Sequence, residues 1–183
     1  EITYGEFWTQ VQYVGSALNH FGVERTDKVA IHSENRPEWL IADIGIQSLG
    51  AISVGLYPTN PPAEVQYLLS HSESKILFAE DQEQVDKALE VSKDVPNLSK
   101  IIYFEEKGLF RYKSDKLMRW DDFLEIGKTE HEKNKDFVTS SIDKIKSEDV
   151  ALMIYTSGTT GPPKASMLSH GNMEWTASII PEI

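Results

Sequence analysis

Short apolar segments alternate with amphipathic ones through the first hundred residues. Apolar residues at helical spacing between positions 7 and 21 predict a first helix, and Thr3 with Glu6 forms a capping-box pattern at its start. Gly22 is a suitable stop for that helix. Four short apolar runs predict buried strands, at 28–32, 52–56, 75–79 and 100–104. The segments between them predict helices, from Pro37 to about Gly50, over about 63–70 and over about 81–92.

The alternation predicts an α/β fold. Strands that are apolar on both faces are typical of a mostly parallel sheet flanked by helices. The length of 183 residues suits roughly one domain. No internal repeat accompanies the alternation of strands and helices.

Composition excludes several classes of function. A net charge of −11 argues against a general nucleic-acid binder, which needs a basic surface. The absence of cysteine excludes disulfides, thiolate metal sites and cysteine nucleophiles. No apolar run approaches the roughly 18 residues of a transmembrane helix. We expect a soluble, cytoplasmic chain, and peripheral contact with a membrane surface stays open; the oligomeric state is not predicted.

Residues 105–150 differ in composition, with 12 acidic and 10 basic residues among 46. One amphipathic stretch, Trp120–Ile126, predicts a short helix. We interpret the segment as a solvated connection, and a regulatory or partner-binding insert is the alternative. Asp121 and Asp122 fit the start of that helix, where acidic side chains are favourable, better than a pair of catalytic carboxylates.

The candidate chemistry lies after residue 150. An apolar strand leads into six small residues, Thr156-Ser157-Gly158-Thr159-Thr160-Gly161, and then into Pro162-Pro163-Lys164. Glycines let backbone N–H groups approach a ligand closely, hydroxyls add donors, and the lysine adds a positive charge. This combination is suited to holding a polyphosphate, and a loop that binds nothing is the alternative.

The arrangement is not the Walker motif, in which a Gly-Lys-Ser/Thr sequence directly opens a helix. Here two prolines separate Gly161 from Lys164, and residues 165–168 predict a second strand. Ser169 then predicts the cap of a helix from about His170 to Ile179.

The segment 155–172, YTSGTTGPPKASMLSHGN, closely resembles the phosphate-loop signature of the adenylate-forming (AMP-binding) superfamily. That group includes acyl-CoA synthetases, adenylation domains of peptide synthetases, and luciferases. Upstream segments resemble the long-chain acyl-CoA synthetase branch: NRPEW at 35–39, GAI at 50–52, YPT at 57–59 and YLL at 67–69. The resemblance covers about residues 1–104 and 147–180.

The resemblance implies that residues 1–183 form part of the large N-terminal domain of an adenylate-forming enzyme. A charged, loosely matching connection lies at about 105–147, and the C-terminal domain is absent. The implied reaction joins a fatty acid to ATP, releases pyrophosphate, and transfers the acyl group to coenzyme A. The residues that would wrap the β- and γ-phosphates are Thr156, Ser157, Gly158, Thr159, Thr160 and Gly161. Lys164 would add positive charge near the departing pyrophosphate.

Several family features have no counterpart in the sequence. These are an aromatic-Gly-x-Thr-Glu signature that places the adenine and a Mg²⁺-binding glutamate, the ribose-binding aspartate, the hinge, and the lysine of the C-terminal domain. We therefore expect the Mg²⁺ ligand to lie outside this sequence, and the chain alone not to catalyse adenylation. Ala165 also stands where the family usually has glycine.

His170 has two interpretations. By resemblance it lies on the substrate side, close to the acyl group; alternatively it is a helix-start residue with a local hydrogen bond. The other histidines, His20, His32, His71 and His131, share no metal-ligand spacing, and we interpret them as structural or exposed.

Three hypotheses for function follow. The first is the N-terminal part of an ATP-dependent long-chain fatty acid–CoA ligase. The second is an amino-acid adenylation domain, disfavoured because Tyr57-Pro58-Thr59 stands where that branch tends to have Leu-Asp-Pro. The third is a truncated, non-catalytic nucleotide-binding module.

Overall fold

The computed structural model describes residues 2–156 and 161–179. In chain order the elements are α1 (Tyr4–His20), β1 (Lys28–His32), α2 (Pro37–Gln47), β2 (Ile52–Leu56), α3 (Pro62–Ser72), β3 (Ile76–Ala79), α4 (Gln82–Val91), β4 (Lys100–Tyr103), β5 (Leu117–Arg119), α5 (Trp120–Lys133), α6 (Phe137–Ile142), β6 (Val150–Thr156), β7 (Lys164–Ser169) and α7 (His170–Ser178).

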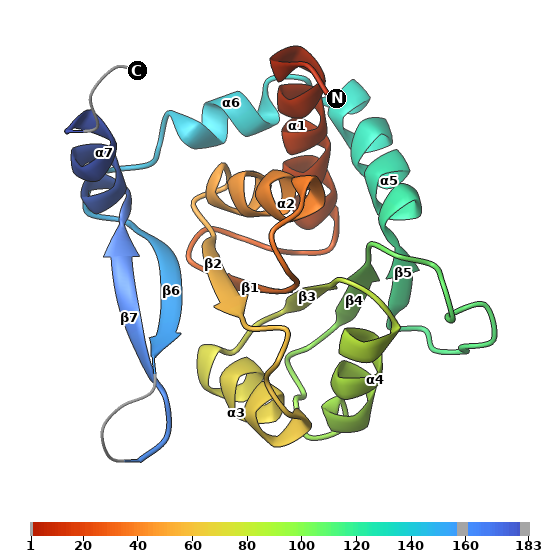
Figure 1. The fold of residues 1–183 in the computed structure, drawn as a ribbon. Helices are drawn as coiled ribbons and strands as arrows, with labels where there is room; N and C mark the ends of the chain where they lie inside the picture. The colour runs from red at the N-terminus through yellow and green to blue at the C-terminus, as the bar shows by residue number, and fades with distance from the viewer. Residues whose placement is uncertain (1, 157–160, 180–183) are drawn as a thin grey trace.

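The strands form one seven-stranded sheet in the order β5-β4-β3-β1-β2-β6-β7. Every neighbouring pair is parallel except β6 and β7, which are antiparallel. The predicted α/β fold with a mostly parallel sheet is confirmed. Figure 1 shows α1, α2 and α5 on one side of the sheet, α3 and α4 on the other, and the β6–β7 hairpin at one end.

Two apolar layers bury the central strands of the sheet, β1 to β4. Strand residues alternate between them, so that Ile31 and Phe78 pack with α1, α2 and α5, while Ala30 and Leu77 pack with α3 and α4. These four side chains are fully buried. A sheet covered on both faces explains why the strands are apolar throughout and not merely at alternate positions.

The predicted helix boundaries are largely confirmed. Thr3 and Glu6 form the capping box of α1, and Gly22 after that helix has a φ of 76°, a conformation that favours glycine. Pro37 is the first residue of α2, and Asp81 caps α4. Ser169 caps α7 through a capping box with Asn172.

The helix predicted at Trp120–Ile126 is confirmed as the first half of α5, but the interpretation of residues 105–150 as a solvated connection with no other structure is wrong. The segment contributes β5 to the sheet and forms two helices, α5 and α6. Trp120 and Phe123 of α5 are buried among residues of α1 and β3. Charged residues dominate the sequence of this segment, and those in α5 lie on the outer side of the helix. The few apolar residues that face the core were therefore not recognised as a contact face.

Helix α5 approaches α1 closely at Gly127. A Cβ atom at this position would lie 2.0 Å from the carbonyl oxygen of Tyr13. Only a residue without a side chain fits there, so α5 packs directly against the backbone of α1.

The parallel strands bring their carboxyl ends to one edge of the sheet, where open α/β sheets bind ligands. Since β6 pairs with β2, Thr156 at the end of β6 lies beside the turn that follows β2, at Tyr57–Asn60. The first residue of the sequence-predicted phosphate loop, Thr156, therefore lies at the ligand-binding edge.

Buried His32, the last residue of β1, supports that turn. Its Nε2 lies 3.1 Å from the carbonyl oxygen of Tyr57. Burial, together with the positive charge of Lys87, lowers the pKa of His32 to about 4. The imidazole is therefore neutral near pH 7, with its proton on Nε2, where it donates to Tyr57. Lys87 donates to the next carbonyl, that of Pro58, at 2.7 Å.

Gly127→Ala should destabilise the protein by about 1–3 kcal/mol, because the added methyl group meets backbone that cannot move aside. The measurement is urea unfolding followed by circular dichroism. Gly5→Ala is the matched control: its new Cβ would meet only the Thr3 hydroxyl, at 3.9 Å. An unchanged unfolding midpoint for Gly127→Ala would contradict the close packing of α1 and α5.

His32 should make stability fall between pH 6.5 and pH 4. In this range the unfolded imidazole, with an ordinary pKa of 6.5, binds a proton that the folded one, with a pKa of about 4, does not. Protonation therefore favours the unfolded state as the pH falls, by up to about 3 kcal/mol. His32→Gln keeps a donor for Tyr57 and does not titrate. The free energy of unfolding of the variant should depend less steeply on pH, and equal slopes would exclude His32 as the cause.

Candidate phosphate-binding site

The predicted phosphate loop joins two antiparallel strands. Thr156 ends β6 and Lys164 begins β7, and the two residues are directly opposite in the ladder. Opposed Cα atoms in such a pair lie about 4.5–5.5 Å apart. The hairpin therefore returns the lysine to the place where the small residues begin, and both residues are exposed.

Four of the predicted phosphate-binding residues, Ser157, Gly158, Thr159 and Thr160, lie outside the described residues. Gly161 is described and has a φ of 92°, a left-handed conformation that strains any other residue. Lys164 has no ion-pair partner among the residues that the structure describes. Its charge is available to an anionic ligand.

A hollow of about 290 Å³ lies beside the hairpin, at the carboxyl ends of β2 and β6. Its lining includes Tyr57, Asn60, Glu64, Tyr155, Thr156 and Pro163. Asn60 is only 7% exposed, and its Oδ1 has no hydrogen-bond partner among the described residues. The hollow thus combines aromatic walls with polar groups next to the loop.

Helix α3 contacts the chain on both sides of the loop. The Tyr67 hydroxyl donates to the carbonyl oxygen of Pro163 at 3.0 Å, and the Tyr155 hydroxyl lies 2.7 Å from Nδ1 of His71. Burial raises the pKa of Tyr155 to about 12, so this residue is a neutral phenol. These contacts could not be predicted from the sequence, because no sequence pattern shows that positions 67 and 163 are in contact.

His170 is not brought together with Thr156 and Lys164. It follows β7, at the opposite end of the strand from the loop, and its backbone N–H donates to the carbonyl of Asp149 at 3.0 Å. It lines a separate hollow of about 410 Å³, with Trp8 and Ile44. Burial lowers its pKa. This geometry favours the helix-start interpretation, and our phosphate-site proposal does not include His170.

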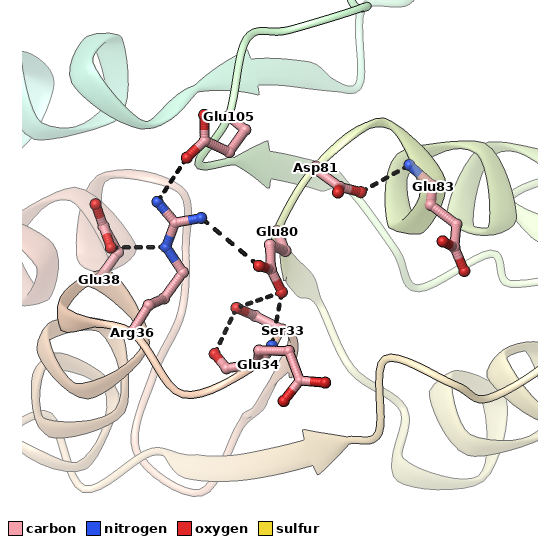
Figure 2. Close-up of polar contacts among 8 residues, drawn as sticks. All are labelled: Ser33, Glu34, Arg36, Glu38, Glu80, Asp81, Glu83 and Glu105. Carbon is pink, nitrogen blue, oxygen red and sulfur yellow. Dashed lines mark hydrogen bonds and ion pairs between the residues drawn. The ribbon is translucent and has the colours of Figure 1, made fainter.

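A second place for a ligand at this edge is the reversal of strand order between β1 and β3. Arg36 occupies it. Its guanidinium lies 2.8 Å from Glu38, 3.0 Å from Glu105 and 3.8 Å from Glu80 (Figure 2). Glu80 also accepts from the backbone N–H of Glu34 at 2.7 Å. These charged groups pair with one another, so the NRPEW segment at 35–39 joins the loops that follow β1, β3 and β4.

The described part of the chain has neither a cluster of metal ligands nor a membrane-spanning helix. No group of three or more His, Cys, Asp or Glu side chains there has the geometry to hold a metal ion. None of the described helices is long and apolar enough to cross a membrane.

Comparison with curated proteins identifies relatives of the whole chain. The long-chain-fatty-acid–CoA ligase ACSBG2 of Xenopus laevis is 34% identical over 182 residues, covering 97% of this chain and 23% of the relative. ACSBG2 of Homo sapiens is 33% identical over 180 residues, covering 98% of this chain and 26% of the relative. The chain thus spans about a quarter of the length of these relatives.

Solved structures share the fold. The anthranilate CoA ligase AuaEII in complex with anthranoyl-AMP superposes with a TM-score of 0.75 at 26% identity, over 98% of this chain and 32% of its own. A luciferase-like enzyme from the nonluminescent Zophobas morio mealworm gives 0.72 at 32% identity, over 92% and 36%. A family model described as AMP-binding enzyme matches residues 1–181. The chain therefore belongs to the AMP-binding family of adenylate-forming enzymes.

Proposed function

We propose that this chain is the N-terminal part of an ATP-dependent long-chain fatty acid–CoA ligase. The relatives that match it over nearly its whole length carry that name, and they support the fatty acid and coenzyme A as substrates. The observation that carries the proposal is the β6–β7 hairpin, which sets Lys164 opposite Thr156 at the carboxyl edge of the sheet.

The proposed reaction has two steps. A fatty-acid carboxylate oxygen attacks the α-phosphorus of ATP, and the bond to the β-phosphate bridging oxygen breaks to give an acyl-adenylate and pyrophosphate. The thiolate of coenzyme A then attacks the acyl carbonyl carbon and AMP leaves, which gives the thioester. In the first step negative charge develops on the departing pyrophosphate, and a fixed positive charge nearby lowers the barrier.

The loop would bind the β- and γ-phosphates through Thr156, Ser157, Gly158, Thr159, Thr160 and Gly161. We place the phosphates at the loop and not in the neighbouring hollow, because the hollow carries the carboxylate of Glu64. Lys164, with no ion pair in the described part of the chain, would supply the compensating charge.

Mg²⁺ accompanies ATP in this proposal, with its protein ligand outside the present sequence. By the same reasoning the 183-residue chain alone should not form acyl-adenylate. The test is ATP–pyrophosphate exchange with a long-chain fatty acid, for the chain alone and for the complete protein that carries it. Exchange that depends on an amino acid instead would favour the amino-acid adenylation domain. No exchange in either preparation would favour a non-catalytic nucleotide-binding module.

In the complete protein, Lys164→Ala should slow ATP–pyrophosphate exchange by about 10- to 150-fold, the value of one charge-assisted contact made in the transition state. The KM for the fatty acid should be unchanged, because the charge acts on phosphate oxygens and not on the acyl chain. Steady-state exchange kinetics measure both quantities.

Lys113→Ala is the matched control, since it removes an exposed lysine from the loop between β4 and β5. Both variants change the net charge equally, so a general electrostatic effect would slow both. An unchanged exchange rate for Lys164→Ala would remove this lysine from the mechanism.

A further inference from the structure

Two residues of α3 contact the two ends of the phosphate loop. Tyr67 and His71 are four residues apart and therefore lie on one face of the helix, one turn from each other. Tyr67 bonds to Pro163, directly before Lys164, and His71 bonds to Tyr155, directly before Thr156. One face of one helix thus contacts β6 and the residue directly before β7, and Figure 1 shows α3 near the end of the hairpin where β6 stops and β7 begins.

The three rings form a continuous row. The centroids of Tyr67 and His71 are 5.4 Å apart, and those of His71 and Tyr155 are 5.7 Å apart in an edge-to-face arrangement. Helix α3 is itself held in the core by Val65, Leu68 and Leu69, which are nearly or fully buried. The loop ends are therefore attached to a part of the fold that core packing fixes.

The bond to Pro163 bears directly on Lys164. A peptide unit is planar, so fixing the direction of the Pro163 carbonyl also fixes the direction of the Lys164 N–H and the position of its Cα atom. Proline restricts the backbone before this peptide as well, because its ring sets φ. A phenylalanine at position 67 would supply the same ring packing without this bond, so the hydroxyl is what orients the peptide.

The bond to Tyr155 fixes the other strand. Tyr155 is 5% exposed and packs in the core layer of α3 and α4. Its hydroxyl either donates to Nδ1 of His71 or accepts from it, depending on the tautomer of the imidazole. In both cases the backbone of Tyr155 is held at two points, the core and α3, immediately before Thr156.

We propose that Tyr67 and His71 are positioning residues for the phosphate loop, acting through Pro163 and Tyr155 to place Lys164 and Thr156. The inference rests on the proposed function, since it assumes that the loop binds the phosphates of ATP. Neither residue touches the phosphates. Their effect is to set the charge of Lys164 in place before the reaction, so that no reorganisation is needed when charge develops on the leaving group.

The test compares Tyr67→Phe and Tyr155→Phe with the unmodified complete protein in ATP–pyrophosphate exchange. Each variant removes one hydroxyl and keeps the ring. Tyr67→Phe should lower kcat by about 3- to 10-fold, as expected for the loss of one neutral hydrogen bond, with the KM for the fatty acid unchanged. Tyr155→Phe should lower kcat in the same range.

Tyr112→Phe is the matched control. The Tyr112 hydroxyl accepts from Gln82 at 2.9 Å and donates to Asp86 at 2.6 Å, against α4 and away from the hairpin. The Tyr112→Phe variant therefore shows how much the loss of tyrosine hydrogen bonds changes the exchange rate through stability alone. Thermal unfolding should give similar shifts for the control and for Tyr67→Phe, whereas only Tyr67→Phe should slow exchange.

A double-mutant cycle separates positioning from a general structural role. If Tyr67 acts through Lys164, adding Tyr67→Phe to Lys164→Ala should lower kcat by less than about twofold, because the group being positioned is gone. A 3- to 10-fold loss of kcat from Tyr67→Phe in the Lys164→Ala background would overturn the inference. Equal losses of kcat for Tyr67→Phe and Tyr112→Phe in the otherwise unmodified protein would also overturn it. So would a Tyr67→Phe variant with the unmodified rate. Absence of exchange in the unmodified protein would instead refute the proposed function.

Discussion

Burial of the parallel sheet on both faces is the constraint on which the rest of the structure depends. Neighbouring residues such as Ala30 and Ile31 point into different core layers, so each of the central strands β1 to β4 needs helices on both sides. Crossover helices supply this cover and keep the strands parallel. As a result the carboxyl ends of β1, β2, β3, β4 and β6 meet at one edge of the sheet. The position of the candidate site is a consequence of how the core is covered.

The cover on the α1 side depends on close backbone contact between helices. A Cβ at Gly45 of α2 would lie 2.4 Å from a methyl group of Val14, and one at Gly127 of α5 would lie 2.0 Å from the Tyr13 carbonyl. These contacts make α5 part of the frame, although its sequence is highly charged. In a sequence, a glycine inside a helical pattern only lowers the expected helix stability. The role of Gly127 as a contact point depends on Tyr13, more than a hundred residues away, which no local pattern contains.

Local signals predicted the parts of the fold that local interactions determine. The caps at Thr3 and Ser169 are hydrogen bonds across three residues, and each appeared directly in the sequence. Strand β5 was missed, since three residues carry no period and its pairing with β4 comes from elsewhere in the chain. In the candidate site, too, the local features were predictable from the sequence and the long-range contacts were not. The loop residues and Lys164 follow from composition and resemblance, and their roles stay predictions. The support from Tyr67 depends on a hydroxyl–carbonyl bond across 96 positions.

Charge balance distinguishes the two halves of the carboxyl edge. Between β1 and β3, the guanidinium of Arg36 is matched by Glu38, Glu80 and Glu105, and hydrogen bonds to Glu38 and Glu105 raise its pKa further. A ligand there would have to displace bonds already made, and burying an unpaired charge is costly. Between β2 and β6, the described residues leave Lys164 without an ion pair and Asn60 with an unpartnered buried oxygen. The uncompensated charge of Lys164 therefore makes the hairpin, and not the Arg36 cluster, the part of this edge that suits an anionic ligand.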